Sequence, residues 1–225
     1  MGISLQEAMQ RVYAARTLSD IKAIFQDFFG KDIFNVDEGT EAKNFRHILG
    51  VEKNVSISTI VAAEKANPNF KNGGVGYHKN YQRCIAVFEM RKRGYGVIAK
   101  PKLTSANEDG IYSSQDCFIN PVSIGRRGGI SQPILNREQL KERLKELGDG
   151  ARAAICWTRP GDGRQGHTIA CEIMNGEIFF VDPQTGRHGD RVLGEANEDG
   201  YSFFQMNHLE FDEQKLELIA EREPS

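Results

Sequence analysis

Residues 166–182 read GHTIACEIMNGEIFFVD, which is two apolar runs joined by Asn175-Gly176. An Asn-Gly pair between two such runs is the strongest short-range signal for a tight β-hairpin, because both residues tolerate the positive φ angles of the turn. With the turn centred on this pair, the numbers of paired residues sum to about 351. His167, at the start of the first strand, is then expected close to Asp182, at the end of the second.

The rest of the C-terminal half also contains strand-like segments. Residues 151–158 and 201–207 are short runs rich in apolar and β-branched or aromatic side chains, and residues 95–99 are a further candidate. Together with the hairpin, these segments predict an antiparallel sheet.

A mostly buried helix is expected over residues 83–93. Its last turn carries the basic run Arg91-Lys92-Arg93, which suits the negative end of a helix dipole, and Gly94 suits the residue that follows a helix.

Residues 31–55 are expected to form a loop with a short helix, and residues 102–135 a substrate-facing insertion or lid. Further helices are expected over residues 4–16, 19–30, 58–65, 136–147 and 212–222. Helices followed by an antiparallel sheet indicate an α+β fold, with the central helix packed against the sheet.

Composition excludes several classes of protein. The chain has 225 residues, of which 39% are hydrophobic and 27% charged, as in ordinary soluble globular domains. The formal net charge of -2 gives no reason to expect nucleic acid, and the basic runs at 91–93 and 126–127 are interpreted as a helix end and a solvated loop. No stretch is long and apolar enough to cross a membrane, and no secretory signal begins the chain. An export signal would therefore lie on a larger parent chain.

The cysteine pattern gives no sign of a metal site. The four cysteines form no CxxC pair and have no zinc-site spacing; they are Cys84, Cys117, Cys156 and Cys171. Neither a metal nor another cofactor is expected.

Three residues have the chemistry of a cysteine-nucleophile site. Cys84 lies at the start of the central helix, where free backbone N–H groups and the helix dipole favour a thiolate. His167 would activate this thiol, and Asp182 would orient the imidazole. Each residue also has an ordinary explanation, namely a buried structural cysteine, a hydrogen-bonded core histidine and a turn over residues 182–186.

Four further residues are candidates for contact with a substrate. The oxyanion of such a reaction would be stabilised by the backbone N–H of Cys84 and by a side-chain amide of Asn80 or Gln82. For Asn80, a helix cap is the alternative. Gln184 is expected either to touch the substrate or to stabilise its turn, and Trp157 either to line a cleft or to pack in the core.

Taken in order, several short motifs resemble those of the papain-fold toxin domains found at the C-termini of bacterial polymorphic toxins and in phage-encoded proteins. Members carry an Asn-Cys-x-x-Cys element that opens a helix, an Arg-rich helix end with Gly, a Gly-His pair and an Asp-Pro-Gln-x-Gly turn. The resemblance covers roughly residues 67–186. The corresponding residues here are Asn80-Tyr81-Gln82-Arg83-Cys84, Arg91-Lys92-Arg93-Gly94, Gly166-His167 and Asp182-Pro183-Gln184-Thr185-Gly186.

The resemblance implies a papain-like fold and a triad of Cys84, His167 and Asp182. One position departs from the family, because Tyr81 replaces the first cysteine of the pair. If that first position were the nucleophile, the chain would be inactive. Cys84 is favoured because papain attacks with the second cysteine of a similar Cys-x-x-Cys-aromatic element, and Cys84 resembles that second position.

By analogy, the expected activity is that of a cysteine hydrolase acting on carboxamide or peptide bonds of a protein, with glutamine deamidation favoured over a thiol protease. A catalytically dead papain-like binding module is the alternative, motivated by Tyr81. Residues 67–225 are expected to form the catalytic domain, and residues 1–66 an N-terminal helical region that is either separate or part of it. The resemblance further implies a toxin or effector that is delivered to the cytoplasm of a target cell, with a protein substrate there and an immunity protein as a partner.

Overall fold

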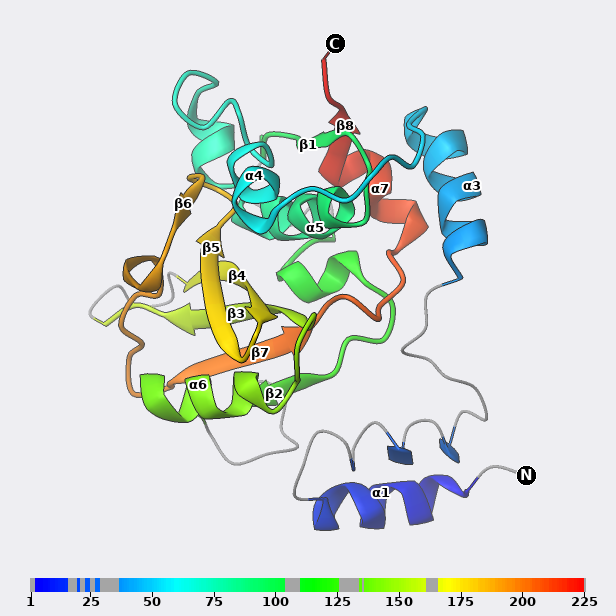
Figure 1. Cartoon of the computed structure of the whole chain (residues 1–225), viewed down its shortest axis with the longest axis vertical. Coiled ribbons are helices and arrows are strands. Elements are labelled where there is room, and N and C mark those ends of the chain that lie inside the picture. Colours follow the sequence, from blue (N-terminus) through cyan, green and yellow to red (C-terminus); the bar gives the residue numbers. More distant parts are fainter. Residues whose placement is uncertain are drawn as a thin grey trace.

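The computed structural model describes most of the chain (Figure 1). The helix expected over residues 19–30 falls mostly outside the described residues, as do parts of the insertion expected over residues 102–135. Arg126-Arg127 falls wholly outside them. The described residues are 3–15, 20, 23–24, 27–28, 37–103, 110–125, 134, 136–160 and 166–224.

Within the described residues, the main sheet has six antiparallel strands in the order β2-β7-β3-β4-β5-β6. The strands expected over residues 151–158, 166–174 and 201–207 are confirmed as β3, β4 and β7. The bounds are β2 (Ser123–Gly125), β3 (Arg152–Thr158), β4 (Gly166–Met174), β5 (Glu177–Asp182), β6 (Arg187–His188) and β7 (Tyr201–Gln205).

The hairpin expected at Asn175-Gly176 joins β4 to β5. The φ angles of these two residues are 52° and 75°, the left-handed conformation that a tight turn of this kind requires. Ala170 pairs with Val181, in the expected register. The start of β4 and the end of β5 therefore lie at the same end of the hairpin, opposite the turn.

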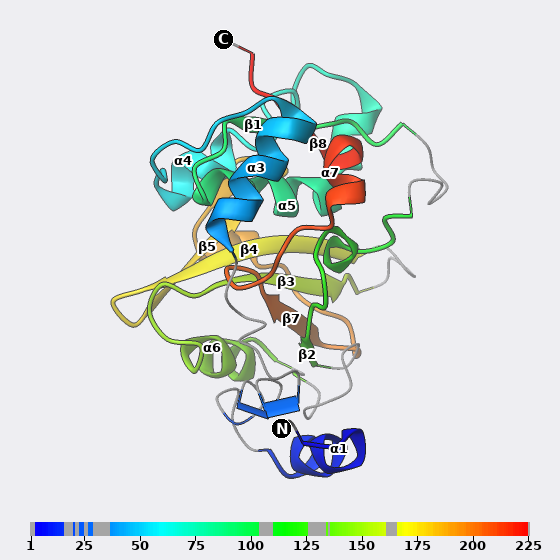
Figure 2. The ribbon, with the colours of Figure 1, turned by 90° about the vertical axis from the view of Figure 1, so that its right-hand side faces the viewer.

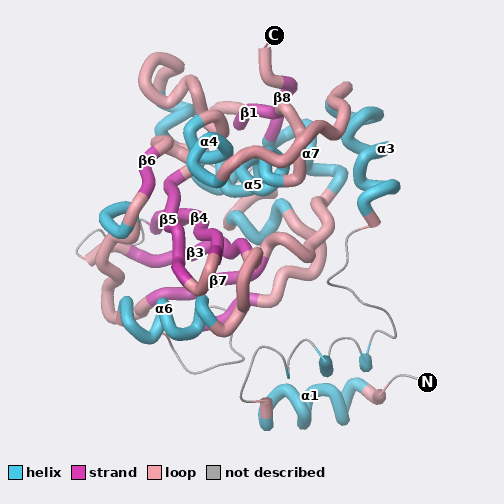
Figure 3. Tube along the Cα trace, in the orientation of Figure 1, coloured by secondary structure: helices cyan, strands magenta, loops and turns pink. Residues whose placement is uncertain are grey.

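Helices cover both faces of the sheet. α5 lies across one face with α3, α4 and α7 around it, and α6 lies on the other face (Figures 1 and 2). Figure 3 shows the same layers by type of element, with a second small sheet of β1 and β8 near α5. None of the described helices has the length and apolar content needed to span a bilayer. The bounds are α1 (Leu5–Ala14), α3 (Glu38–Leu49), α4 (Thr59–Glu64), α5 (Tyr81–Lys92), α6 (Arg137–Lys145), α7 (Glu213–Ile219), η1 (Val75–His78), η2 (Ser114–Cys117), η3 (Asp190–Val192), β1 (Val97–Ala99) and β8 (Ala220–Arg222).

The alternation of side chains along the strands divides the core into two parts. Ala154 and Ala170 belong to the cluster on the α5 side, whereas Ile155 and Ile169 belong to the cluster on the α6 side. This is the two-residue period of a strand that is buried on both faces. On the α5 side, these two strand positions carry small alanine side chains that pack in one cluster with residues of α5.

α5 is the central helix that the sequence predicts, and it begins two residues earlier than expected. Every residue from Gln82 to Arg91 is buried, as expected for a helix enclosed on all sides. Gly94 follows the helix with a φ of 100°, and a Cβ at this position would lie 2.1 Å from the carbonyl oxygen of Asn54. Both the conformation and the space therefore require glycine.

A buried carboxylate in α5 is neutralised by two arginines. Glu89 is 0% exposed, and it accepts hydrogen bonds of 2.8 Å from Arg93 and from Arg152 of β3. Burial alone would raise the pKa of Glu89, but the charges of Arg152 and Arg93 lower it to about 2. Arg93 also pairs with Glu41 of α3. The ion pairs of Glu89 and Arg93 therefore connect α5 with β3 and with α3.

Three elements differ from the expectation. α3 has 12 residues where a loop with a short helix is expected, and Asp37 caps it by accepting from two backbone N–H groups. The helix expected over residues 212–222 ends at Ile219, because β8 pairs with β1 instead. β2 lies within the insertion expected over residues 102–135 and pairs with β7. For β2 and β8, pairing with a strand that is distant in the sequence determines the local structure.

Residues on both sides of the expected domain boundary share one core. Phe45, Val51 and Ala62 belong to the same cluster as Ile85 and Phe88 of α5. The segment over residues 38–66 thus packs directly on the central helix. The division into residues 1–66, as an N-terminal helical region that is either separate or part of the same domain, and residues 67–225 stays a prediction.

We expect Glu89→Gln to destabilise the protein by about 3–5 kcal/mol at pH 7, because it leaves buried arginines without their counter-charge. Since folding lowers the pKa of Glu89 from 4.5 to about 2, its contribution is present above pH 4.5 and is lost as the pH falls toward 2. Chemical denaturation at a series of pH values measures both effects. Glu146→Gln, which removes a partly exposed ion pair with Arg143, is the control and should cost less than about 1 kcal/mol. A Glu89→Gln variant as stable as the wild type at pH 7 would contradict this account.

Candidate active site

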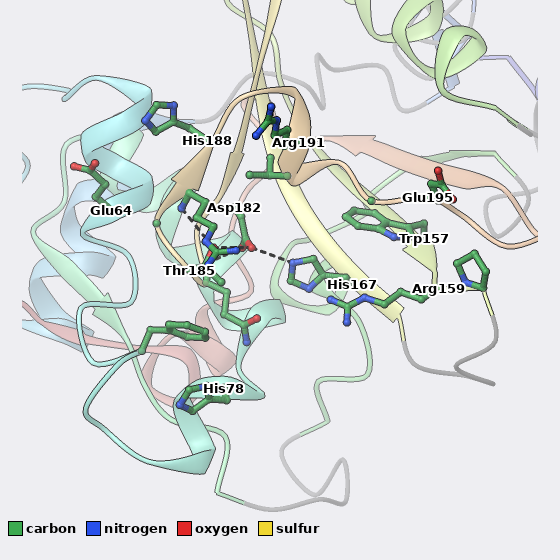
Figure 4. A pocket seen from close by; sticks show the side chains of 17 residues that line it. Glu64, His78, Trp157, Arg159, His167, Asp182, Thr185, His188, Arg191 and Glu195 are labelled. Atoms are coloured by element: carbon green, nitrogen blue, oxygen red, sulfur yellow. Dashed lines mark hydrogen bonds and ion pairs between the residues drawn. The ribbon is translucent and has the colours of Figure 1, made fainter.

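A pocket of about 1200 Å³ lies beside the start of β4 and the end of β5 (Figure 4). Four of the predicted site residues line it, namely Trp157, His167, Asp182 and Gln184. The three predicted site residues within the segment 80–84 are not among the described residues that line it.

The hairpin register brings His167 to Asp182. His167 is the second residue of β4, and Asp182 is the last residue of β5. The imidazole Nε2 and the carboxylate Oδ2 are 3.2 Å apart and form a hydrogen bond (Figure 4). The other ring nitrogen, Nδ1, has no hydrogen-bond partner among the described residues. An imidazole held by a carboxylate, with one nitrogen open, can accept a proton from a nucleophile.

The turn after β5 closes around the Asp182 carboxylate. Oδ1 accepts from the backbone N–H of Gln184 at 3.0 Å, and Oδ2 accepts from the Thr185 hydroxyl at 2.9 Å. Gly186 has a φ of 72°, and its N–H donates to the carbonyl oxygen of Asp182 at 2.8 Å. The segment is therefore a turn, and the same turn fixes the direction of the carboxylate.

These contacts keep Asp182 ionised. Burial alone would raise the pKa of this carboxyl group, but the hydrogen bond and charge of His167, with the Thr185 hydroxyl and the Gln184 N–H, hold the pKa below its ordinary value. The imidazole is therefore hydrogen-bonded to a charged carboxylate.

Cys84 lies in the first turn of α5 and within the hydrophobic core. It is 0% exposed, and its Sγ donates to Oδ1 of Asn80 at 3.3 Å. Its backbone N–H donates to the Asn80 carbonyl at 3.0 Å, as an ordinary helix bond. Burial raises the pKa of the thiol well above its ordinary value, and the charge of Asp182 raises it further. In this structure, burial therefore outweighs the stabilisation of a thiolate expected at a helix start.

Tyr81 is the residue of α5 whose ring contacts the imidazole. The ring centroids of Tyr81 and His167 are 5.5 Å apart, in an edge-to-face arrangement. Tyr81 and Cys84 are three positions apart, so they lie on neighbouring turns of one helix face. Among the described residues, the hydrogen bonds of Cys84 run to Asn80 and none runs to His167.

Asn80 occupies the N-cap position of α5, but its side chain makes no capping bond. Its Nδ2 donates to Oδ1 of Asn67 at 3.3 Å and to the carbonyl of Lys100 at 3.1 Å. Both amide hydrogens are therefore engaged, and the oxyanion role stays a prediction that requires one of these bonds to break. Asn67, which the sequence analysis missed, also donates to the Gln184 carbonyl at 3.0 Å. Its only local signal is its position before a proline at a helix end.

The remaining amide and indole candidates differ in their placement. Gln82 is buried with its Oε1 unpartnered and does not line the pocket. Trp157 lies edge-on to His167, with 5.4 Å between ring centroids and an interplanar angle of 89°. Trp157 and Gln184 both line the pocket, and their contact with a substrate stays a prediction.

Residues 79–187 match the sequence model of a family described as papain fold toxin 1, glutamine deamidase. The match covers just under half of the chain and includes α5, the hairpin of β4 and β5, and the turn that follows it. The α+β architecture, with a central helix on an antiparallel sheet, is thus a papain-like fold. No curated protein and no solved structure matches the chain significantly.

We expect Cys84 to react slowly with iodoacetamide in the native protein at neutral pH, because only the thiolate attacks and burial disfavours it. The half-buried Cys156 is an internal comparison and should react faster. Mass spectrometry of the modified peptides over time, in buffer and in urea, measures both rates. Rapid modification of native Cys84, ahead of Cys156, would show an activated thiolate and contradict this expectation.

Proposed function

Because residues 79–187 belong to the papain-fold toxin family, we propose that the chain is a cysteine hydrolase that deamidates glutamine side chains of a protein. Cys84 is the nucleophile, His167 the general base and acid, and Asp182 the residue that orients the imidazole. The observation that supports this most is the 3.2 Å hydrogen bond between His167 Nε2 and Asp182 Oδ2 in the wall of an open pocket.

The electrostatics of the pair suit a proton transfer. The pKa of Asp182 is held below its ordinary value, so the carboxylate is charged when His167 takes a proton. Nδ1 of His167 is left open among the described residues. An imidazole with one nitrogen held by a carboxylate and the other open is the arrangement that a thiol nucleophile requires.

The proposed reaction has two stages. Cys84 gives its proton to His167 and attacks the carboxamide carbon, so that a C–S bond forms and an electron pair moves to oxygen. When this intermediate collapses, the C–N bond breaks and ammonia leaves with the proton from His167. Water, deprotonated by His167, then attacks the thioester; the C–S bond breaks, and glutamate and the thiol are released. A thiol protease would follow the same steps with an amine in place of ammonia.

This function requires movement at the start of α5. Cys84 is fully buried, and the Tyr81 ring lies 5.5 Å from the imidazole between centroids. A bound substrate would have to displace Tyr81 and bring the sulfur within hydrogen-bond reach of the imidazole. Apo sites are often looser than the complexes in which reaction occurs.

A second candidate function is a papain-like binding module without catalysis. The contact between Tyr81 and His167 favours it, because Tyr81 stands where the family has its first cysteine. In this case Cys84 is a core residue, and the pocket holds a protein segment without turnover.

The toxin family supports a protein as the target of this domain. We propose that the chain is delivered to the cytoplasm of a target cell. An immunity protein would protect the producing cell by blocking the pocket.

We expect proteins of bacterial cells that express the chain to show glutamine converted to glutamate, as measured by mass spectrometry. Cys84→Ala should lower the rate of conversion about 10⁴-fold or more, because the nucleophile is lost. Cys156→Ala removes a thiol from β3 outside this site and is the matched control. New chain termini in place of the conversion would indicate proteolysis, and conversion that persists in Cys84→Ala would refute the assignment.

Tyr81→Cys distinguishes the two candidate functions. A module that is inactive because the family cysteine is missing should gain conversion on this substitution, whereas Tyr81→Ser should not. If Cys84 is the nucleophile, the wild type should already convert glutamine. Conversion in neither the wild type nor Tyr81→Cys would leave only the binding function.

A further inference from the structure

Gln184 lies in the wall of the pocket, and its side-chain Nε2 is buried without a hydrogen bond to any described residue. The residue is 6% exposed, its Nε2 is buried without a partner, and neither side-chain amide atom has a hydrogen bond among the described residues. Buried amides are normally paired, since an unpaired one costs free energy. An unpaired amide such as that of Gln184, in the wall of a pocket, therefore suggests that a ligand supplies the missing partner.

The main chain of Gln184 is held from two sides. Its N–H donates to Oδ1 of Asp182 at 3.0 Å, and its carbonyl accepts from Nδ2 of Asn67 at 3.0 Å. Oδ2 of the same carboxylate bonds to His167. Gln184 and the imidazole are thus fixed to one carboxylate, and the side-chain amide of Gln184 makes no hydrogen bond to the part of the chain that the structure describes.

Three other N–H groups of the site are engaged or hindered, and the Arg159 guanidinium, which also lines the pocket, offers donors but no acceptor (Figure 4). Asn80 uses both amide hydrogens, and the backbone N–H of Cys84 is part of the helix. Trp157 Nε1 is also unpartnered, but its ring packs against Gly194, where an added Cβ would lie 3.0 Å from Nε1. The Gln184 amide is therefore the better-placed group for a polar contact with a ligand.

We propose that Gln184 recognises the primary carboxamide of the substrate through a pair of amide–amide hydrogen bonds. A primary carboxamide offers a carbonyl acceptor and an NH₂ donor, so the side chain of Gln184 can donate to one and accept from the other. This inference rests on the proposed function for the reaction itself. The side-chain N–H of Gln184 would also stabilise the substrate oxygen as it becomes negative. A carboxylate product has no N–H to donate, so the contact favours substrate over product.

The kinetic test uses N-acetyl-L-glutamine methylamide and its γ-methyl ester analogue, which lacks the NH₂ donor. Gln184→Met removes both hydrogen-bonding groups, and Gln184→Glu keeps only acceptors. Both variants should lower kcat/KM for ammonia release roughly 10²-fold, mainly through kcat, and should lose most of the wild-type preference for amide over ester. The matched control is Gln214→Met, on the exposed face of α7. An unchanged amide-to-ester ratio in both variants would overturn the proposal.

The free energy of unfolding of Gln184→Met distinguishes a role of the Gln184 amide in substrate recognition from a role in the fold. Because the Gln184 amide has no hydrogen-bond partner within the described ranges, Gln184→Met should leave the free energy of unfolding unchanged or higher. A clear loss of stability in this variant would show that the amide supports the fold instead.

A binding measurement distinguishes failure of this inference from failure of the proposed function. The side-chain NH₂ signals of Gln184 can be identified by their loss in Gln184→Met, in amide proton–nitrogen correlation spectra. In Cys84→Ala, these signals should shift on titration with N-acetyl-L-glutamine methylamide and much less with N-acetyl-L-glutamate methylamide. A shift without ammonia release by the wild type would support the recognition role and refute the reaction. No shift at the highest soluble concentration would overturn the role of Gln184, whatever the activity.

Discussion

The carboxylate of Asp182 is the group on which both the turn and the candidate site depend. It bonds to the His167 ring, to the Thr185 hydroxyl and to the backbone of Gln184. Its charge also acts on the thiol of Cys84. Because Asp182 is the last residue of β5, the hairpin register determines where this charge lies. Sheet geometry and site electrostatics are therefore set by the same short segment.

The parts of the fold that could be predicted are those with local causes. Asn175-Gly176 determines the turn and, through the register, the contact between His167 and Asp182. The apolar run before Gly94 determines α5. β2 and β8 could not be predicted, because each is a strand only through pairing with a distant segment. Local propensity is outweighed by such tertiary contacts.

The burial of the Cys84 sulfur could not be predicted from the sequence either, because it also depends on tertiary packing. Tyr81 and Cys84 share one face of α5, and periodicity does not say which of them meets the imidazole. The charge–dipole effect at a helix start is worth about 0.3–1 kcal/mol, which is less than about one pKa unit. Full burial of an ionisable group can change its pKa by up to about 3–5. Burial is the larger effect, and it keeps the Cys84 thiol protonated in this arrangement. Catalysis therefore requires a conformation of the first turn of α5 in which the Cys84 sulfur reaches the imidazole.

The ion pairs of Glu89 also bear on how the chain reaches its native state. Its carboxylate is neutralised by arginines from α5 and β3, and one of these arginines also binds α3. An intermediate with the helix layer formed but β3 undocked would hold a buried charge with only part of its compensation. Such an intermediate is costly, since an incompletely paired buried charge is strongly destabilising. Helix layer and sheet are thereby coupled into one cooperative folding unit.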